Sequence, residues 1–184
     1  SEIVPTEIAI LALYALFTEN KVGLFNLLKE KHPDIQLSFK DADLRGEAKA
    51  WKVDLHGQIL FDTDYIREHS QRVLDGINLD NCRFDGSNFQ EVSLRDSSFN
   101  SSVLVNVNFR KSDLTNANFE DAFLNGANFT DAILDKANVK GATLGRTLFV
   151  NTDLSETKGL DDTKNLTWSE ISFSTLTKSS FHVS

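Results

Sequence analysis

The sequence predicts an all-β solenoid of five-residue repeats, a fold in which the chain turns a corner every five residues. The first observation is an apolar Phe, Leu or Val at every fifth position, sixteen times in succession, from Leu79 to Leu154. The second is a small or β-branched residue two positions before each of these centres. The third is a longer period of twenty, which aligns Phe89, Phe109 and Phe129. A period of five fits neither a continuous helix nor a continuous strand.

Four corners close a coil of twenty residues, so the centres fall into four columns. These are Leu79, Phe99, Phe119 and Val139; Phe84, Leu104, Leu124 and Leu144; Phe89, Phe109, Phe129 and Phe149; and Leu94, Leu114, Leu134 and Leu154. Stacked coils place the members of a column about 4.8 Å apart, like strands in a sheet. Dense packing of four large centres per level then requires the small residues. We call the position two residues before each centre the small slot. Cys82 occupies the small slot before Phe84 and is therefore predicted to be a core residue.

The motif is seen most clearly in Ala117-Asn118-Phe119-Glu120-Asp121 and Ala127-Asn128-Phe129-Thr130-Asp131. This pattern resembles the pentapeptide-repeat protein family, and the resemblance covers Asp75–Glu156 without interruption. It implies a right-handed quadrilateral β-helix with inward centres and outward polar positions. The first eight repeats use Ser, Val, Ile and Cys where the family usually has Ala, which predicts less regular turns there.

The chain outside the regular repeats is expected to close the two ends of the solenoid. An open end exposes unpaired backbone and core, so residues 1–36 are predicted to form an N-terminal α-helical cap with helices over Thr6–Thr18 and Lys21–Lys31. Residues 37–74 are expected to form an irregular first coil with a helical insertion. Residues 75–156 are the regular β-helix, and residues 157–184 are predicted to be a C-terminal loop and partial coil, with Ile171, Leu176 and Phe181 as inward centres.

Charge and composition argue against several classes of partner. The net charge is −8, and residues 75–160 carry −4 with 8 basic and 12 acidic residues, so no region is basic enough to bind nucleic acid non-specifically. The longest apolar run, Ile8–Phe17, is too short to span a membrane. Cys82 is the single cysteine, so an internal disulfide is excluded and a reducing, cytoplasmic location is expected.

No catalytic or cofactor motif is apparent in the sequence. The histidines lack metal-ligand spacing; they are His32, His56, His69 and His182. A Gly-rich phosphate loop, a Gly-x-Ser-x-Gly elbow and a His-Glu-x-x-His helix are all missing. The sequence therefore predicts a protein that is not an enzyme and needs no cofactor and no metal.

A cluster of outward apolar residues is the candidate interaction patch. Val103, Val105 and Phe123 flank the centres of the Phe84 column, where polar residues are expected. The rest of the patch is expected on the two adjoining columns, namely Ile133, Leu148 and Val150. Apolar groups clustered on a flat β-face often mark an interface. The alternatives are that these residues are scattered on the surface or that the inserted helix covers them.

The predicted function is a protein–protein interaction scaffold that binds through a solenoid face or the helical cap, with a homodimer as one candidate assembly. The family resemblance implies an alternative, a DNA-mimic regulator of DNA gyrase. That role favours a continuous negative face, whereas basic residues are interleaved among the acidic ones here. By resemblance alone, a bacterial effector or a cyanobacterial regulatory protein is a third class.

Overall fold

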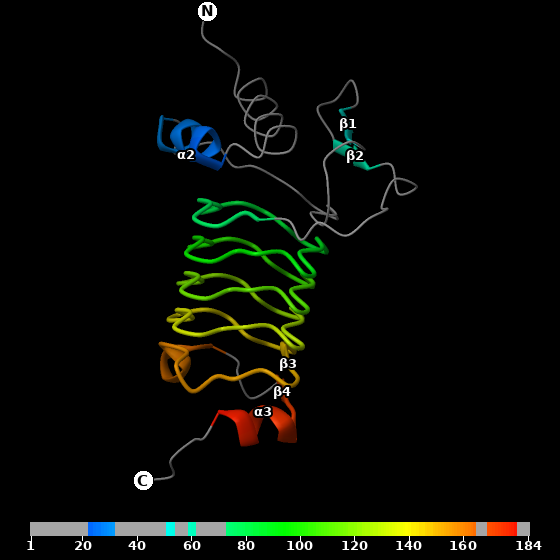
Figure 1. Ribbon diagram of the computed structural model, residues 1–184, viewed down its shortest axis with the longest axis vertical. Helices are drawn as coiled ribbons and strands as arrows, with labels where there is room; N and C mark the ends of the chain where they lie inside the picture. Colours follow the sequence, from blue (N-terminus) through cyan, green and yellow to red (C-terminus); the bar gives the residue numbers. More distant parts are fainter. Residues whose placement is uncertain (1–21, 32–50, 54–58, 62–72, 165–168, 180–184) are drawn as a thin grey trace, which may run out of the picture.

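The coil stack is the main body of the protein. The computed structural model describes residues 22–31, 51–53, 59–61, 73–164 and 169–179. Residues 73–164 form coils stacked along one axis, with α2 (Val22–Lys31) over the N-terminal end and α3 (Phe173–Lys178) at the other end (Figure 1). Parallel bridges join residues twenty apart, from Val73 with Ser93 to Asn138 with Lys158. The predicted register of twenty is therefore confirmed.

A β-turn after each centre gives the coil its four sides. At Phe109, for example, the backbone N–H of Ser112 donates to the Phe109 carbonyl at 3.1 Å, and Lys111 between them has a φ of 56°. Every fifth residue from 76 to 151 likewise has a positive φ, between 55° and 72°. A positive φ at the third residue is the pattern of a type II turn. Asn, Asp and Gly occupy most of these positions because they tolerate this conformation best.

The expectation of less regular turns in the first eight repeats is wrong. The turn residues of these repeats have φ values from 56° to 71°, within the range of the later ones. Serine can replace Ala in the small slot because its hydroxyl forms hydrogen bonds inside the core. The Ser102 hydroxyl donates to the Leu79 carbonyl at 2.6 Å, and the Ser112 hydroxyl donates to the Phe109 carbonyl at 2.7 Å. Both serines are fully buried.

Backbone hydrogen bonds join each coil to the next. The N–H of Phe109 donates to the Asn128 carbonyl at 2.8 Å, and the N–H of Asn108 donates to the Ser87 carbonyl at 2.9 Å. A side therefore contributes one short parallel rung per level, and each rung is bonded both above and below. This ladder holds the outward residues of a side in straight vertical rows.

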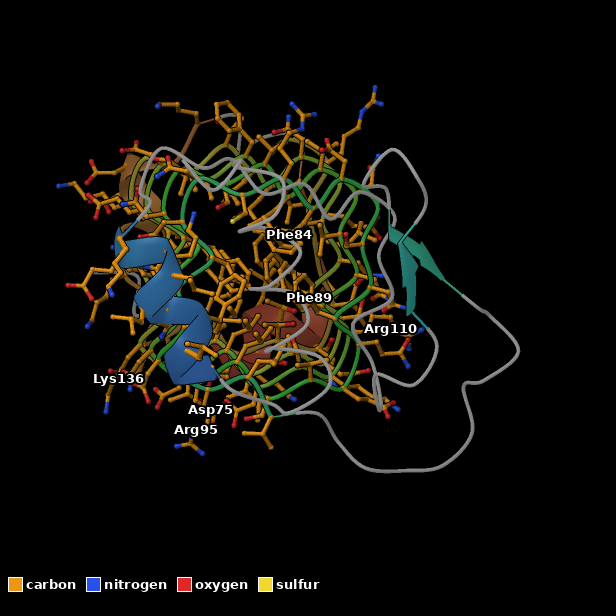
Figure 2. The ribbon with its side chains drawn as sticks, turned by 90° about the horizontal axis from the view of Figure 1, so that it is seen from above. Asp75, Phe84, Phe89, Arg95, Arg110 and Lys136 are labelled. Atoms are coloured by element: carbon orange, nitrogen blue, oxygen red, sulfur yellow. The ribbon has the colours of Figure 1, made fainter. Side chains whose placement is uncertain are left out.

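Stacked phenylalanine rings fill the core. The Phe109 ring lies 5.2 Å from those of Phe89 and Phe129, with interplanar angles of 17° and 10°. The neighbouring column repeats the arrangement, since Phe99 and Phe119 stack at 5.0 Å. Rings of the two columns meet edge to face, which is a favoured aromatic geometry. Viewed along the axis, Phe84 and Phe89 point inward, whereas Arg95, Arg110 and Lys136 point outward (Figure 2).

Helix α2 lies over the first coil and coincides with the predicted helix over Lys21–Lys31. Its Phe25 side chain is fully buried in the same core as the repeat centres. The Asn26 amide donates to the Gly76 carbonyl and accepts from the Asn78 N–H, both at 2.7 Å. In later coils the corresponding N–H bonds to a carbonyl of the preceding coil, as Ser98 does with Ile77. The Asn26 side chain thus takes the place of a preceding coil.

Two short strands are described between α2 and the coil stack. Strands β1 (Trp51–Val53) and β2 (Ile59–Phe61) pair antiparallel, with Trp51 opposite Phe61. These six residues therefore do not form the parallel rungs expected of an irregular first coil. The predicted helix over Thr6–Thr18 and the helical insertion before Leu74 lie outside the described residues.

The last coil becomes longer on each successive side. Lys158 pairs with Asn138 at an offset of 20, Lys164 pairs with Thr143 at 21, and β4 (Glu170–Ile171) pairs with β3 (Leu148–Phe149) at 22. The short 3-10 helix η2 (Leu160–Asp162) lies within this coil. The insertions explain why the five-residue phase is lost in the sequence although the coil continues.

Helix α3 occupies the position where a further partial coil was predicted. Leu176, expected to point inward, is 47% exposed, and its neighbour Thr175 is fully buried instead. The Thr175 hydroxyl accepts from the Thr152 N–H at 3.1 Å, and the Ser179 hydroxyl accepts from the Leu154 N–H at 2.9 Å. Hydroxyl oxygens therefore bond the backbone donors at this end of the stack. The predicted centre Phe181 lies outside the described residues.

Candidate interaction surface

The coil stack presents four sides, which we name after their first complete centres: the Leu79, Phe84, Phe89 and Leu94 sides. On the Phe84 side, Val103 forms a parallel bridge with Phe123, and Phe123 forms one with Thr143. Phe123 is 50% exposed, and Val103 and Val105 are partly buried. The structure thus brings three of the predicted patch residues together on two successive rungs. The repeat places them there because residues on either side of a centre point outward.

The other three patch residues lie elsewhere. Leu148 and Val150 flank Phe149 on the neighbouring Phe89 side, and both are partly buried. Ile133 flanks Leu134 on the Leu94 side. The columns follow one another in the order 79, 84, 89 and 94, so the Leu94 side is opposite the Phe84 side. The expectation that Ile133 adjoins Phe123 is therefore wrong, and the candidate surface reduces to Val103, Val105 and Phe123 with their neighbours.

Among the described residues of the Phe84 side, the charged ones lie at its two ends. Near the N-terminal end Arg83 and Asp85 form an ion pair at 3.1 Å. Towards the C-terminal end, Arg146 occupies the corner and Lys164 continues the row of Thr143. The rungs between them are free of charge; their outward and corner residues are Val103, Val105, Asn106, Phe123, Asn125, Gly126, Thr143 and Gly145. The result is an uncharged band with an excess of positive charge at its lower edge.

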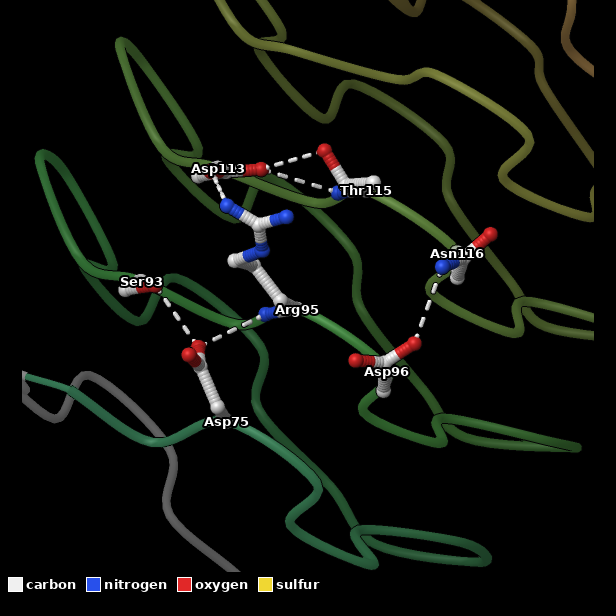
Figure 3. Close-up of polar contacts among 7 residues, drawn as sticks. All are labelled: Asp75, Ser93, Arg95, Asp96, Asp113, Thr115 and Asn116. Carbon is white, nitrogen blue, oxygen red and sulfur yellow. Dashed lines mark hydrogen bonds and ion pairs between the residues drawn. The ribbon is translucent and has the colours of Figure 1, made fainter.

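The opposite Leu94 side is acidic, a feature that the sequence analysis did not isolate. Its outward and corner positions hold six acidic residues against Arg95 and Lys136; the acidic ones are Asp75, Asp96, Asp113, Asp135, Asp153 and Glu156. Figure 3 shows how the upper ones are held within the stack. Asp75 accepts from Ser93 and from the Arg95 N–H, and Asp113 pairs with Arg95 at 3.5 Å.

A hollow of about 310 Å³ lies on the lower part of the Leu94 side, around Ile133. Ile133 is 51% exposed. Four carboxylates and one ammonium group belong to the lining, which consists of Asp131, Ala132, Ile133, Leu134, Asp135, Asn151, Asp153, Ser155, Glu156 and Lys178. The signal in the sequence is Ile133, an outward isoleucine that lies twenty residues from both Asp113 and Asp153.

The reactive groups in the core are engaged in structural contacts. The Lys29 ammonium donates to the Asp80 carbonyl at 2.8 Å and lies 3.7 Å from the Cys82 sulfur, which itself donates to the same carbonyl at 3.4 Å. Cys82 is fully buried, as its small slot predicts. Within the described ranges, no group of three His, Cys, Asp or Glu side chains is placed to hold a metal ion. The histidines themselves lie outside those ranges.

A helix that crosses a bilayer must be both long and apolar. Among the residues that the structure describes, none of the helices meets both conditions for crossing a membrane. The prediction of no membrane partner stays an expectation from the sequence.

Several solved structures are similar to this chain. A pentapeptide repeat protein from the Arabidopsis thaliana thylakoid lumen is 23% identical with a TM-score of 0.45; the match covers 47% of this chain and only 60% of the plant protein. Rfr23 from the cyanobacterium Cyanothece 51142 is 19% identical with a TM-score of 0.43, over 83% of this chain and 97% of its own. QnrB1, a plasmid-mediated fluoroquinolone resistance protein, is 19% identical with a TM-score of 0.36, over 69% and 67%. No curated protein sequence matches the chain.

The family comparison agrees with the geometry. The family model described as a pentapeptide repeat region matches residues 76–149. This range coincides with the regular turns and the bridges at an offset of twenty. A pentapeptide repeat region implies a right-handed quadrilateral β-helix. Residues 76–149 are thus a pentapeptide repeat region, and the chain is similar to pentapeptide repeat proteins.

Proposed function

We propose that this protein is a non-catalytic scaffold that binds a partner protein through the Phe84 side of its coil stack. The observation that supports this most strongly is Phe123, a large apolar side chain that is 50% exposed on a row bridged to Val103. The repeat requires an apolar residue at the centres and not at this outward position. Burial of such a ring against a partner is favourable by about 25 cal/mol per Å² of apolar area.

The rigidity of the coil stack favours binding at this side. Both backbone polar groups of Phe123 are bonded to the preceding coil, since its N–H donates to the Ser102 carbonyl and its carbonyl accepts from the Leu104 N–H. Little backbone freedom remains to be lost when a partner binds. Preorganisation of this kind increases affinity for a given buried area.

The N-terminal helix is the second candidate contact. We infer that α2 is the N-terminal cap, because Phe25 enters the core and Asn26 bonds two backbone groups of the first coil. Its outer face carries Leu24 and Leu27, which are 42% and 44% exposed. A scaffold that binds through its cap would use these two leucines.

Replacing Phe123 by aspartate is expected to abolish capture of the partner from extracts of the native cell. A carboxylate at this position cannot be buried in an apolar contact without a large desolvation cost. The substitution is outward, so the variant is expected to unfold at the same denaturant concentration as the parent within about 0.5 kcal/mol. Quantitative affinity capture with both proteins, followed by denaturation of each, measures the two effects.

Leu27→Asp on the outer face of α2 is the matched variant. Loss of capture with Leu27→Asp but not with Phe123→Asp would transfer the binding site to the cap. Retention of the partner by both variants would contradict the proposal that either surface carries the function.

The acidic Leu94 side is the observation that supports the alternative, a DNA-mimic regulator of DNA gyrase. Six acidic residues lie along it in vertical rows, although Arg95 and Lys136 interrupt them. On this reading, addition of the protein would inhibit supercoiling by purified gyrase, and Asp135→Lys with Asp153→Lys would relieve the inhibition. Supercoiling unaffected by a molar excess of the parent protein would eliminate this candidate.

A further inference from the structure

The two opposite sides of the coil stack carry opposite charge. With the corner residue that follows each centre included, the Phe84 side has three basic residues and one acidic residue, namely Arg83, Arg146, Lys164 and Asp85. The Leu94 side has six acidic residues and two basic ones. Each side also exposes a large apolar residue in its third coil by about half, Phe123 on the first and Ile133 on the second; the Leu94 side exposes Val73 as well, at its N-terminal end. The two sides therefore carry net charges of opposite sign, and each has an exposed apolar residue among its outward positions.

The complementary groups also lie at matching heights along the axis. Counted in coils of twenty from Ile77, Phe123 and Ile133 both fall in the third coil, residues 117–136. Arg146 and Asp153 both fall in the fourth coil, residues 137–156. A second copy displaced sideways, without a shift along the axis, would therefore bring Phe123 to the level of Ile133 and Arg146 to the level of Asp153.

Within the described part of the chain, the charges at these heights are not paired with opposite charges. Arg146, Asp135 and Asp153 are exposed, and among the described residues they form no ion pair. By contrast, the acidic groups higher on the Leu94 side are already occupied, as Asp113 is by Arg95 (Figure 3). The carboxylates that line the hollow around Ile133 form no ion pair among the described residues, although Asp131 accepts from the Asn151 amide and Asp153 from the Ser155 N–H.

We propose that the Phe84 side of one molecule binds the Leu94 side of a second copy, with Phe123 seated in the hollow around Ile133. This inference rests on the proposed function, since it names the partner of the Phe84 side. The contact is heterologous: it joins two different surfaces and leaves both outer surfaces of the pair free. Because the two sides are opposite, successive copies form an open row rather than a closed ring.

The mass of the full chain in solution tests this directly. Sedimentation equilibrium is expected to give an average mass that rises with concentration past twice that of the monomer, without a plateau. Salt should reverse the effect, because the Debye length falls from about 10 Å at 0.1 M to about 3 Å at 1 M. A mass that stays at the monomer, or that stops at a dimer, would overturn the inference.

Two single variants separate the two surfaces. Phe123→Asp removes the ring on the Phe84 side, and Ile133→Asp places a carboxylate in the hollow of the Leu94 side. Each variant alone is expected to be monomeric. An equimolar mixture is expected to form a dimer and nothing larger, because one intact side of each kind remains and the two introduced carboxylates repel each other. A mixture that remains monomeric contradicts the proposed pairing.

Control variants keep the test decisive. Val150→Asp makes the same kind of change on the Phe89 side and is expected to leave association as in the parent. If Phe123→Asp fails to fold, Arg146→Glu provides the same test through the charge at an exposed corner. If the parent is monomeric but Phe123→Asp loses a captured protein, self-association is wrong and the proposed function stands. If Phe123→Asp changes neither self-association nor the capture of a partner protein, both the self-association and the proposed binding at the Phe84 side are wrong.

Discussion

Replacing Phe109 by alanine is expected to lower the free energy of unfolding by about 3–5 kcal/mol, the range measured for buried aromatic residues cut to alanine. Phe109 is fully buried, with ring centroids 5.2 Å away on both sides in its own column and 5.8 Å away in the next. The backbone ladder above and below prevents the coils from closing the cavity. Chemical denaturation followed by circular dichroism measures the change.

Phe123→Ala is the matched control, since it makes the same chemical change on an outward position. Phe123 is 50% exposed and has no place in the aromatic columns, so the expected change is within about 0.5 kcal/mol. The difference between the two variants measures how much the inward direction of a centre contributes to the free energy of unfolding. Equal destabilisation by the two substitutions would contradict the assignment of Phe109 to the core.

The sequence predicts the coil stack well because one constraint is repeated many times. Each centre must point to the same axis, so a single error in register would expose a whole column, and the strict spacing from Leu79 to Leu154 leaves one solution. The turn conformation could also have been read from the pattern. Residues such as Asn81, Asp96 and Gly126 recur two places after a centre, where the chain needs a positive φ.

The ends of the stack are less predictable because they do not repeat. Offsets that grow to 22 between β3 and β4 hide the last coil from any search at a fixed period. At α3 the core-facing residue is Thr175 rather than the apolar Leu176, since the closing helix must bond backbone groups as well as cover apolar ones. A pattern of apolar residues alone therefore selects the wrong neighbour.

The candidate surface was predictable in part. Outward Val103 and Phe123 fall on one column in the sequence, twenty residues apart, and the structure bridges them. The relation of Ile133 to this surface depends on the order of the columns around the axis, which puts it on the opposite side. Its hollow depends on neighbours from other repeats and from α3, such as Lys178, and no single-column pattern contains them.

Thr175→Val is expected to destabilise the protein by about 1–3 kcal/mol although valine has nearly the same shape as threonine. The Thr175 hydroxyl donates to the Phe149 carbonyl at 2.6 Å and accepts from the Thr152 N–H at 3.1 Å. Thr175 is fully buried, so water cannot replace it. A buried polar group left without a partner costs about 1–3 kcal/mol. The substitution removes the partner of the Thr152 N–H, whereas the Phe149 carbonyl still accepts from the Ser172 N–H at 3.1 Å.

Thr177→Val on the same helix is the control for this prediction. Thr177 is exposed and its hydroxyl donates to the Ser174 carbonyl at 2.9 Å, so water can take over that bond and the change is expected to stay within about 0.5 kcal/mol. Hydrogen exchange adds a local readout, because the Thr152 amide should lose protection in Thr175→Val and keep it in Thr177→Val. Equal stability of the two variants, with unchanged exchange at Thr152, would show that the hydroxyls of α3 do not close the C-terminal end. In that case the coil stack would owe its stability at this end to apolar contacts such as that of Ile171 with the core.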